Sequence, residues 1–167
     1  MAAKTPPDTA PGGGARRARM PDRGVRHHAR ALAVQGLYGW LIQGGDAERI
    51  GTQLLTEEQL AKVDVPYFRE VLGATVASAE ALRAEFAGLV DRPVASLSPI
   101  EHAILLLGTH ELRDRPEIPY RVVINEAVEL AKSFGGTDGF RYVNGVLDKL
   151  AARLRSVEAR SPDAGAD

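Results

Sequence analysis

Residues 125–136 read NEAVELAKSFGG and residues 140–150 read FRYVNGVLDKL. Around the first stretch, apolar side chains recur every three to four residues, the period of one helix face, at Val123, Ala127, Leu130 and Phe134. Gly135-Gly136 ends that helix, and Thr137 or Asp138 can cap the next one. The apolar seam of this last helix runs from Phe140 to Leu154. The two stretches therefore predict two helices joined by a glycine break.

Helical periodicity extends upstream over most of the chain. One seam steps by four and three residues from Phe68 to Leu89, with Asp64 as a candidate cap before it. The segment 98–101 reads SPIE, a capping-box pattern with proline in the first turn. It opens a helix whose run Ala103–Leu107 is apolar on every face, as in a central buried helix.

The predicted fold class is all-α, because no sustained alternation of apolar and polar residues indicates a strand. We expect a bundle of about five long helices. The first should run from about Arg23 to Gln43, and a further short helix should lie near Ala47–Leu60.

Composition excludes several classes of protein. The chain has 167 residues, 44% of them hydrophobic, so it can bury a sizeable core, and it contains no cysteine. Disulfides, thiol catalysis and cysteine metal sites are therefore excluded. No apolar run approaches a membrane span, and no apolar segment follows the basic N-terminus as it would in a secretory signal. We expect a cytoplasmic protein without a membrane partner.

Charge is distributed unevenly along the chain. Residues 1–30 hold seven Lys or Arg and two Asp, a net charge of +5, which leaves −6 for the remainder of a chain whose total is −1. Residues 1–22 and 156–167 are poor in large apolar side chains, so we expect a disordered basic arm and a disordered tail around a folded domain at 23–155. The arm indicates either attraction to a polyanion or a solubilising tail.

The first helix combines basic and aromatic residues. At 100° per residue, Arg23, Arg26, His27 and Arg30 share one third of its circumference, and Leu37 and Leu41 follow in the same sector. We expect the first half of this helix to project a basic edge. Tyr38 lies within about 20° of the direction of His27, and an aromatic ring near cations suits single-stranded RNA. Tyr38 is equally consistent with a core position, and for Trp40 the core is favoured.

No pattern supports catalysis or a cofactor. The glycine-rich segment 134–139 follows a helix rather than a strand and has no lysine in P-loop register. His27-His28 lacks metal-ligand partners at suitable spacing, and His102 and His110 are too far apart along one helix to share a metal. Carboxylates such as Glu126 fit a solvated helix face. We therefore expect neither an enzyme nor a metal site.

Five segments in order resemble the NusB family of bacterial transcription antitermination factors. They are Arg26–Arg30 with 33–40, then 64–70, 101–112, 118–120, and the C-terminal stretches quoted above. The resemblance implies an all-helical fold of two small packed subdomains. It implies that the protein, with the ribosomal protein NusE, binds boxA RNA and joins the RNA polymerase antitermination complex in ribosomal RNA operons.

The resemblance also assigns roles to individual residues. It places RNA contacts at Arg26, His27, His28, Arg30, Tyr38, Lys132, Phe134, Asp138 and Tyr142. It places Glu101 on the NusE-facing surface. Many family members have consecutive arginines where this chain has His27-His28, and neutral histidine supplies less charge at pH 7.

Two alternatives stay open at this point. The first is a helical protein-interaction adaptor whose basic arm only adds solubility. The second is the NusB-like RNA-binding domain of a ribosomal RNA cytosine methyltransferase, without its catalytic domain. The sequence leaves the choice between monomer and homodimer undecided.

Overall fold

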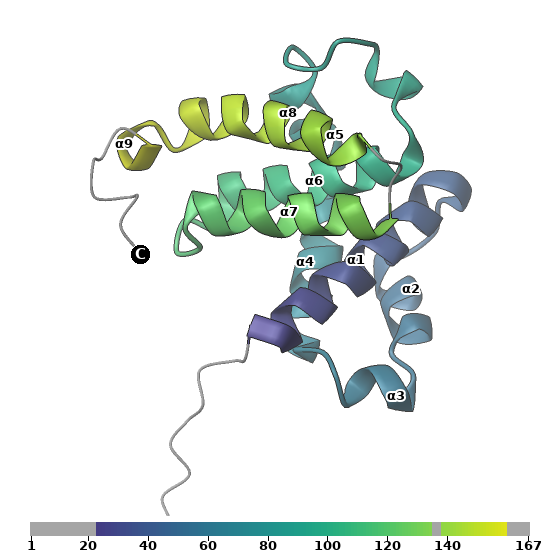
Figure 1. The fold of residues 1–167 in the computed structure, drawn as a ribbon. Coiled ribbons are helices and arrows are strands. Elements are labelled where there is room, and N and C mark those ends of the chain that lie inside the picture. The colour runs from purple at the N-terminus through teal and green to yellow at the C-terminus, as the bar shows by residue number, and fades with distance from the viewer. Residues whose placement is uncertain (1–22, 135–137, 160–167) are drawn as a thin grey trace, which may run out of the picture.

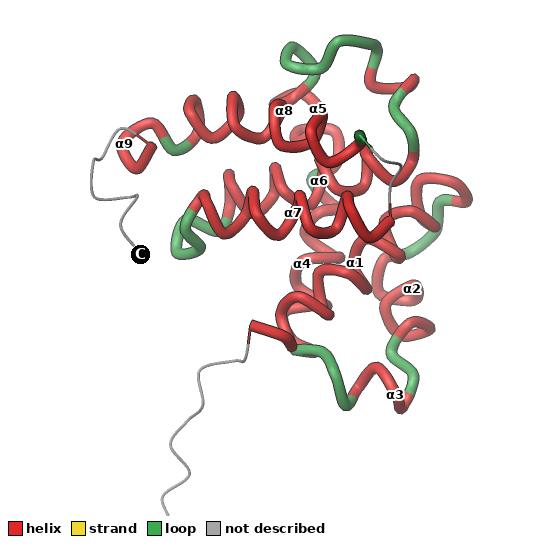
Figure 2. Tube along the Cα trace, viewed as in Figure 1, coloured by secondary structure: helices red, strands yellow, loops and turns green. Residues whose placement is uncertain are grey.

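The computed structural model describes residues 23–134 and 138–159, in which helices are joined by short loops and no strand occurs (Figures 1 and 2). The helices are α1 (Arg23–Gln43), α2 (Ala47–Leu54), α3 (Glu57–Leu60), α4 (Val65–Ala77), α5 (Ala79–Phe86), a 3₁₀ turn (Val94–Ser96), α6 (Pro99–Asp114), α7 (Tyr120–Phe134), α8 (Gly139–Leu154) and α9 (Ser156–Ala159). The all-α prediction is confirmed. The disorder expected for 1–22 lies outside the described residues.

Helix α6 forms the centre of the fold. The Ser98 hydroxyl accepts a hydrogen bond from the Glu101 amide at 3.2 Å, and Pro99 occupies the first turn, so α6 begins where its sequence indicates. Its residues from Ala103 to Leu112 are all buried. Helices α1 and α4 pack on α6 from one side and α7 and α8 from the other, which gives two small subdomains that share this helix (Figure 1).

The predicted bounds of α1 are confirmed at Arg23 and Gln43. Gly44 and Gly45 follow with φ values of 70° and 110°, a left-handed backbone that glycine adopts without steric cost and that ends the helix. Leu32, Ala33 and Leu37 bury one face of α1. This face packs against α4 and α6, so the N-terminal half of α1 lies beside the centre of the molecule.

The single helix expected across residues 68–89 is interrupted. Ser78, with φ −105° and ψ 12°, separates α4 from α5, although Phe68, Leu72, Leu82 and Phe86 of the predicted seam are all buried. Both segments contact α6. A bend at Ser78 therefore carries one seam around α6, as helices often curve around a core. The region 47–60 likewise holds two short helices, α2 and α3, instead of one.

Helices α7 and α8 run in opposite directions on one side of α6 (Figure 1). The folded part was expected to end at Arg155, but Ser156–Ala159 forms one more helical turn, α9. Glu158 explains this difference, because its carboxylate accepts hydrogen bonds from the Tyr120 amide at 3.0 Å and from Arg155 at 2.7 Å. No helix within the described ranges is long and apolar enough to cross a membrane.

Candidate nucleic-acid interface

One face of α1 is open to solvent along its length. His28 is exposed, Tyr38 is 39% exposed and Ile42 is 55% exposed. His27, one residue before His28, keeps 38% of its side-chain surface, and the two imidazole rings meet edge to face at 6.1 Å between centroids. Trp40 instead packs partly against the core, with the Arg83 guanidinium 5.7 Å from its ring, as favoured from its sequence position.

Arg26 lies at the edge of this face. Its Nε is 3.8 Å from Asp64 Oδ2, and its guanidinium lies 4.6 Å from the centroid of the Tyr67 ring. Asp64 is the N-cap of α4, where its carboxylate also accepts from the Tyr67 amide at 3.2 Å. The Asp64 amide donates to the Val25 carbonyl at 3.2 Å. These contacts hold the first turns of α1 against the start of α4. Arg26 remains half-exposed beside them.

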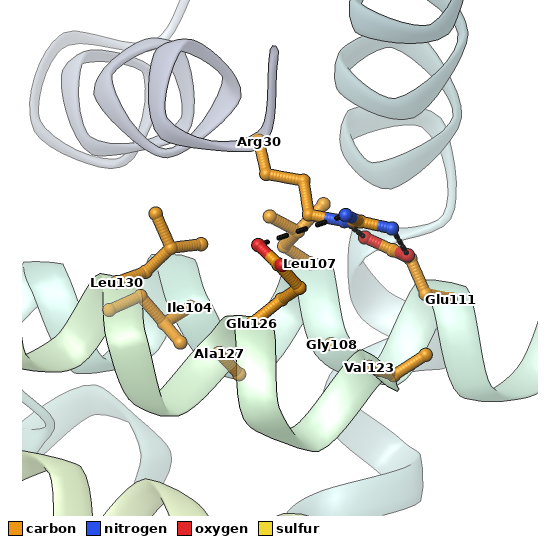
Figure 3. Close-up of a pocket in the computed structure, with 9 residues that line it drawn as sticks. All are labelled: Arg30, Ile104, Leu107, Gly108, Glu111, Val123, Glu126, Ala127 and Leu130. Carbon is orange, nitrogen blue, oxygen red and sulfur yellow. Dashed lines mark hydrogen bonds and ion pairs between the residues drawn. The ribbon is translucent and has the colours of Figure 1, made fainter. Parts of the chain in front are cut away.

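Arg30 turns inward, unlike its neighbours. Its side chain is 5% exposed, and its Nε and Nη2 donate to the two carboxylate oxygens of Glu111 at 2.8 and 3.0 Å (Figure 3). Burial on its own lowers the pKa of the Arg30 guanidinium, but hydrogen bonding to Glu111 and its negative charge outweigh burial and raise that pKa. Arg30 therefore stays charged inside the protein, away from the basic edge that the sequence predicted.

Glu126 connects α7 to α1. Its Oε2 is 2.7 Å from His27 Nδ1 and 3.8 Å from Arg30 Nη1 (Figure 3 shows the second contact). The expectation of a solvated helix face is wrong for this residue, because two α1 side chains lie against its carboxylate. His27 thus presents one ring nitrogen to Glu126 and keeps part of its surface toward solvent.

A second cluster lies where α7 ends and α8 begins. Lys132 is exposed, with its Nζ 3.6 Å from Glu129 and 5.1 Å from the centroid of the Phe140 ring. Phe134 is half-buried against the core. Asp138 is exposed at the N-cap position of α8, but its side chain makes no capping hydrogen bond. Thr137, the other candidate cap, lies outside the described residues.

Tyr142 belongs to this second cluster. Its ring is half-buried, and the Arg92 guanidinium lies 4.9 Å from the ring centroid. Burial raises the pKa of the Tyr142 hydroxyl, so it stays protonated at neutral pH. Arg92 also donates to its neighbour Asp91 at 2.8 Å. Arg92 could not be identified from the sequence, since the loop after α5 carries no recognisable motif.

Glu101, the expected partner contact, is half-buried in the first turn of α6. A Cβ added to Gly139 would lie 3.2 Å from its Oε1, so the carboxylate reaches the start of α8. An acidic group near the first turn of a helix suits the helix dipole. Glu101 therefore lies close to the second cluster rather than to the basic residues of α1.

These positions divide the predicted site residues into three groups. Arg26, His27, His28 and Tyr38 reach the surface of α1, and Lys132 and Asp138 reach it at the α7–α8 junction. Phe134 and Tyr142 are half-buried beside that junction, and Arg30 is buried. Within the described ranges, no group of three or more His, Cys, Asp or Glu could hold a metal ion.

Comparison with known proteins decides the family. A model of the NusB family matches residues 27–152. This chain belongs to the NusB family. It is 50% identical over 148 residues to the transcription antitermination protein NusB of Bordetella pertussis, covering 86% of this chain and 96% of that protein. It is 54% identical over 129 residues to the protein of the same name from Nitrosospira multiformis, covering 77% and 82%.

Solved NusB structures share the fold. T. maritima NusB superposes with a TM-score of 0.68 at 25% identity, covering 75% of this chain and 89% of that one. A NusB chain crystallised with NusE and dsRNA gives a TM-score of 0.70 at 22% identity, covering 76% and 96%. The arrangement of two helical subdomains is therefore that of the NusB family.

Proposed function

We propose that this protein is an RNA-binding transcription antitermination factor. With the ribosomal protein NusE, it binds boxA-type RNA and promotes antitermination by RNA polymerase in ribosomal RNA operons. One observation carries this proposal: about half of the aligned residues are identical to those of proteins named as transcription antitermination proteins, and the alignments cover most of both chains. A NusB structure of the same fold has been crystallised with NusE and dsRNA.

The RNA contacts are proposed at the solvent-facing members of the predicted site. On α1 these are Arg26, His27, His28 and Tyr38, and at the α7–α8 junction they are Lys132 and Asp138, with Phe134 and Tyr142 beside them. Cations there neutralise phosphates, and the exposed Tyr38 ring offers a stacking surface for an unpaired base. This chemistry suits single-stranded RNA.

A titration of boxA RNA with the full chain, with and without NusE, tests the proposal. We expect salt-dependent binding that NusE strengthens, and weaker binding to a scrambled RNA of equal length. Lys132→Ala should flatten the salt dependence by about 0.7 log units of affinity per log unit of salt for one lost phosphate contact. Lys62→Ala is the matched control, because Lys62, in the turn after α3, is likewise an exposed lysine in an ion pair, here with Glu58. Binding of NusE without RNA binding would favour the adaptor function instead.

We further propose that Glu101 contributes to the NusE surface. Reversing a charge at an interface replaces attraction with repulsion, so Glu101→Lys should weaken NusE binding. Because Glu101 lies beside the α7–α8 junction, the added lysine should not weaken RNA binding by the protein alone. Glu80→Lys is a suitable control, because Glu80 is also an acid in the first turn of a helix, α5. Equal NusE affinity for the parent and Glu101→Lys in calorimetric titration would place the partner surface elsewhere.

A further inference from the structure

Arg30 is tied to three other helices at one point inside the molecule. Its guanidinium makes a two-pronged ion pair with Glu111 of α6 and lies 3.8 Å from Glu126 of α7 (Figure 3). The ring of Tyr67, from α4, lies 5.2 Å from the same guanidinium. Planar guanidinium groups match carboxylates in this geometry, which fixes orientation as well as distance. Few rotations of α1 about its axis are compatible with all three contacts.

The surroundings leave Arg30 little freedom to turn outward. Apart from Arg30 and the two carboxylates, the pocket is lined by glycine, alanine and aliphatic side chains from α6 and α7, among them Leu107 and Leu130. A guanidinium that left this pocket would abandon Glu111, which is 1% exposed, as an unpaired buried charge. A phosphate at the protein surface, screened by water and salt, would not offset that loss.

The inward direction of Arg30 determines which α1 side chains face outward. Successive residues turn by 100°, so His28 points about 200° away from Arg30 and is exposed. His27 lies about 60° from Arg30, and its ring meets the same Glu126 carboxylate at 2.7 Å. The orientation of the exposed histidine and the half-exposed one therefore depends on the buried pair.

We propose that Arg30 is a positioning residue. Its buried ion pair with Glu111 holds α1 in the rotation that presents Arg26, His27 and His28 to RNA, while Arg30 itself contacts no phosphate. This inference rests on the proposed RNA-binding function, and it replaces the direct contact that sequence resemblance implied for Arg30.

The test compares Arg30→Met, Glu111→Met and the double variant, using boxA RNA affinity measured over a range of salt concentrations. Arg30→Met leaves the buried Glu111 carboxylate unpaired, and Glu111→Met leaves Arg30 only the longer contact with Glu126, whereas the double variant removes both charges at similar volume. We expect each single variant to bind RNA about tenfold or more weakly. The double variant leaves no unpaired buried charge, so it should recover part of this loss, but without the two-pronged pair it should still bind more weakly than the parent, with an unchanged salt slope.

A direct phosphate contact makes the opposite prediction. The double variant would then recover nothing relative to Arg30→Met, and its salt slope would be smaller by about 0.7, the value for one lost contact on a single strand. Arg26→Met is the matched control, because it removes a half-exposed cation one turn earlier on α1 and should show that smaller slope. A double variant that behaves like Arg26→Met overturns the inference while leaving RNA binding itself established.

One further variant and the parent itself cover the remaining outcomes. If the double variant does not fold, Arg30→Lys serves instead: it keeps the charge but not the two-pronged geometry, so a positioning role predicts weaker RNA binding at an unchanged slope. Affinity equal to the parent would overturn that role. If the parent binds no boxA RNA, the proposed function fails first, and the inference fails with it.

Discussion

The two ends of α6 are fastened in different ways. At its N-terminus, Ser98 caps the helix from three residues before Glu101, within one turn of chain. At its C-terminus the donor is the residue that follows α8: the Arg155 guanidinium donates to the carbonyls of Glu111, Leu112, Arg115 and Ile118, at 3.2, 2.7, 2.9 and 3.0 Å. The first end is held by local sequence and can be recognised in it. The second depends on the completed fold.

The contacts of Arg155 at the C-terminal end of α6 are also connected to the proposed RNA-binding face of α1. Glu111 offers its backbone carbonyl to Arg155 and its carboxylate to Arg30 of α1. Glu158, which pairs with Arg155, accepts from the first amide of α7. The C-terminal end of α6 is thus where α1, α7, α8 and α9 are held relative to one another, whereas the N-terminal end has its own cap, Glu101 and one hydrogen bond from Arg83 of α5 to His102.

Arg155→Met should have the largest effect on stability. It removes the donor to four carbonyls and leaves Glu158 without its cation, at a site that is 8% exposed. We expect a loss of about 3–5 kcal/mol in the free energy of unfolding, the scale for breaking a buried pair. Urea denaturation followed by circular dichroism measures it.

Arg153→Met is the control for this change. Arg153 lies two residues earlier, in α8, but it is exposed and its ion pair is with Glu85, so the loss should stay below about 1 kcal/mol. Equal losses in the two variants would remove the distinction between the two ends of α6.

A truncation in the middle of α6 should cause the next largest loss of stability. Leu106 is fully buried between the two subdomains, so Leu106→Ala should cost about 2–5 kcal/mol. The same denaturation experiment applies, with Ala152→Gly on the exposed face of α8 as a control that loses only helix propensity, about 1 kcal/mol. A loss at Leu106 well under 1 kcal/mol would contradict its central position.

Periodicity and local caps were sufficient to predict most of the fold. The bounds of α1, the Asp64 and Ser98 caps and the buried seam from Phe68 to Phe86 all depend on residues a few positions apart. The bend at Ser78 was not predictable, because the seam keeps its period across it. The turn of α9 was missed because its anchor, Tyr120, lies 38 residues away in the sequence.

The candidate site was predicted less well, for a reason visible in Arg30. It lies about 20° from Leu37 in helical projection, and Leu37 is fully buried. Because Arg30 shares a helix face with the buried Leu37, the sequence could have indicated that Arg30 points into the protein and not toward a basic surface. Glu111 gave a matching signal, because it shares a helix face with the apolar Ile104 and Leu107 and a buried charge needs a partner. No local feature identified Arg155 as the residue that holds the end of α6, because its carbonyl acceptors are 37 to 44 residues distant.

The N-terminal half of α6 should respond to acid. His102 is half-buried against Phe86, and its Nε2 accepts from Arg83 Nε at 3.0 Å, which requires an unprotonated nitrogen. Burial, followed by the charge of Arg83, lowers the pKa of His102 to about 4. Because the unfolded state binds this proton more readily, the stability that neutral His102 supports is complete above about pH 6.5 and falls as the pH drops toward 4.

Comparison with His102→Gln isolates this effect. Glutamine can still accept a hydrogen bond from Arg83 but does not titrate in this range. The stability of His102→Gln should therefore fall less than that of the parent as the pH drops. We expect a difference of about 1 kcal/mol in the change between pH 7 and pH 5, after allowing for solvent screening at a half-buried site. If the free energy of unfolding of the two proteins changed equally with pH, His102 would not be held neutral in the folded protein.

The smallest effect should come from the local cap itself. Ser98→Ala removes the acceptor for the Glu101 amide, but that amide lies near the surface and can bond to water, so we expect a loss of about 0.5–1 kcal/mol. Ser98→Asp should keep the cap, because its carboxylate can accept the same hydrogen bond and favours a helix N-terminus. Ser133→Ala is the matched control: Ser133 bonds to the Glu129 carbonyl within α7, and its loss should be close to zero. If Ser98→Ala destabilised the fold as much as Arg155→Met, the local cap would matter as much as the distant one, and the two ends of α6 would be equivalent.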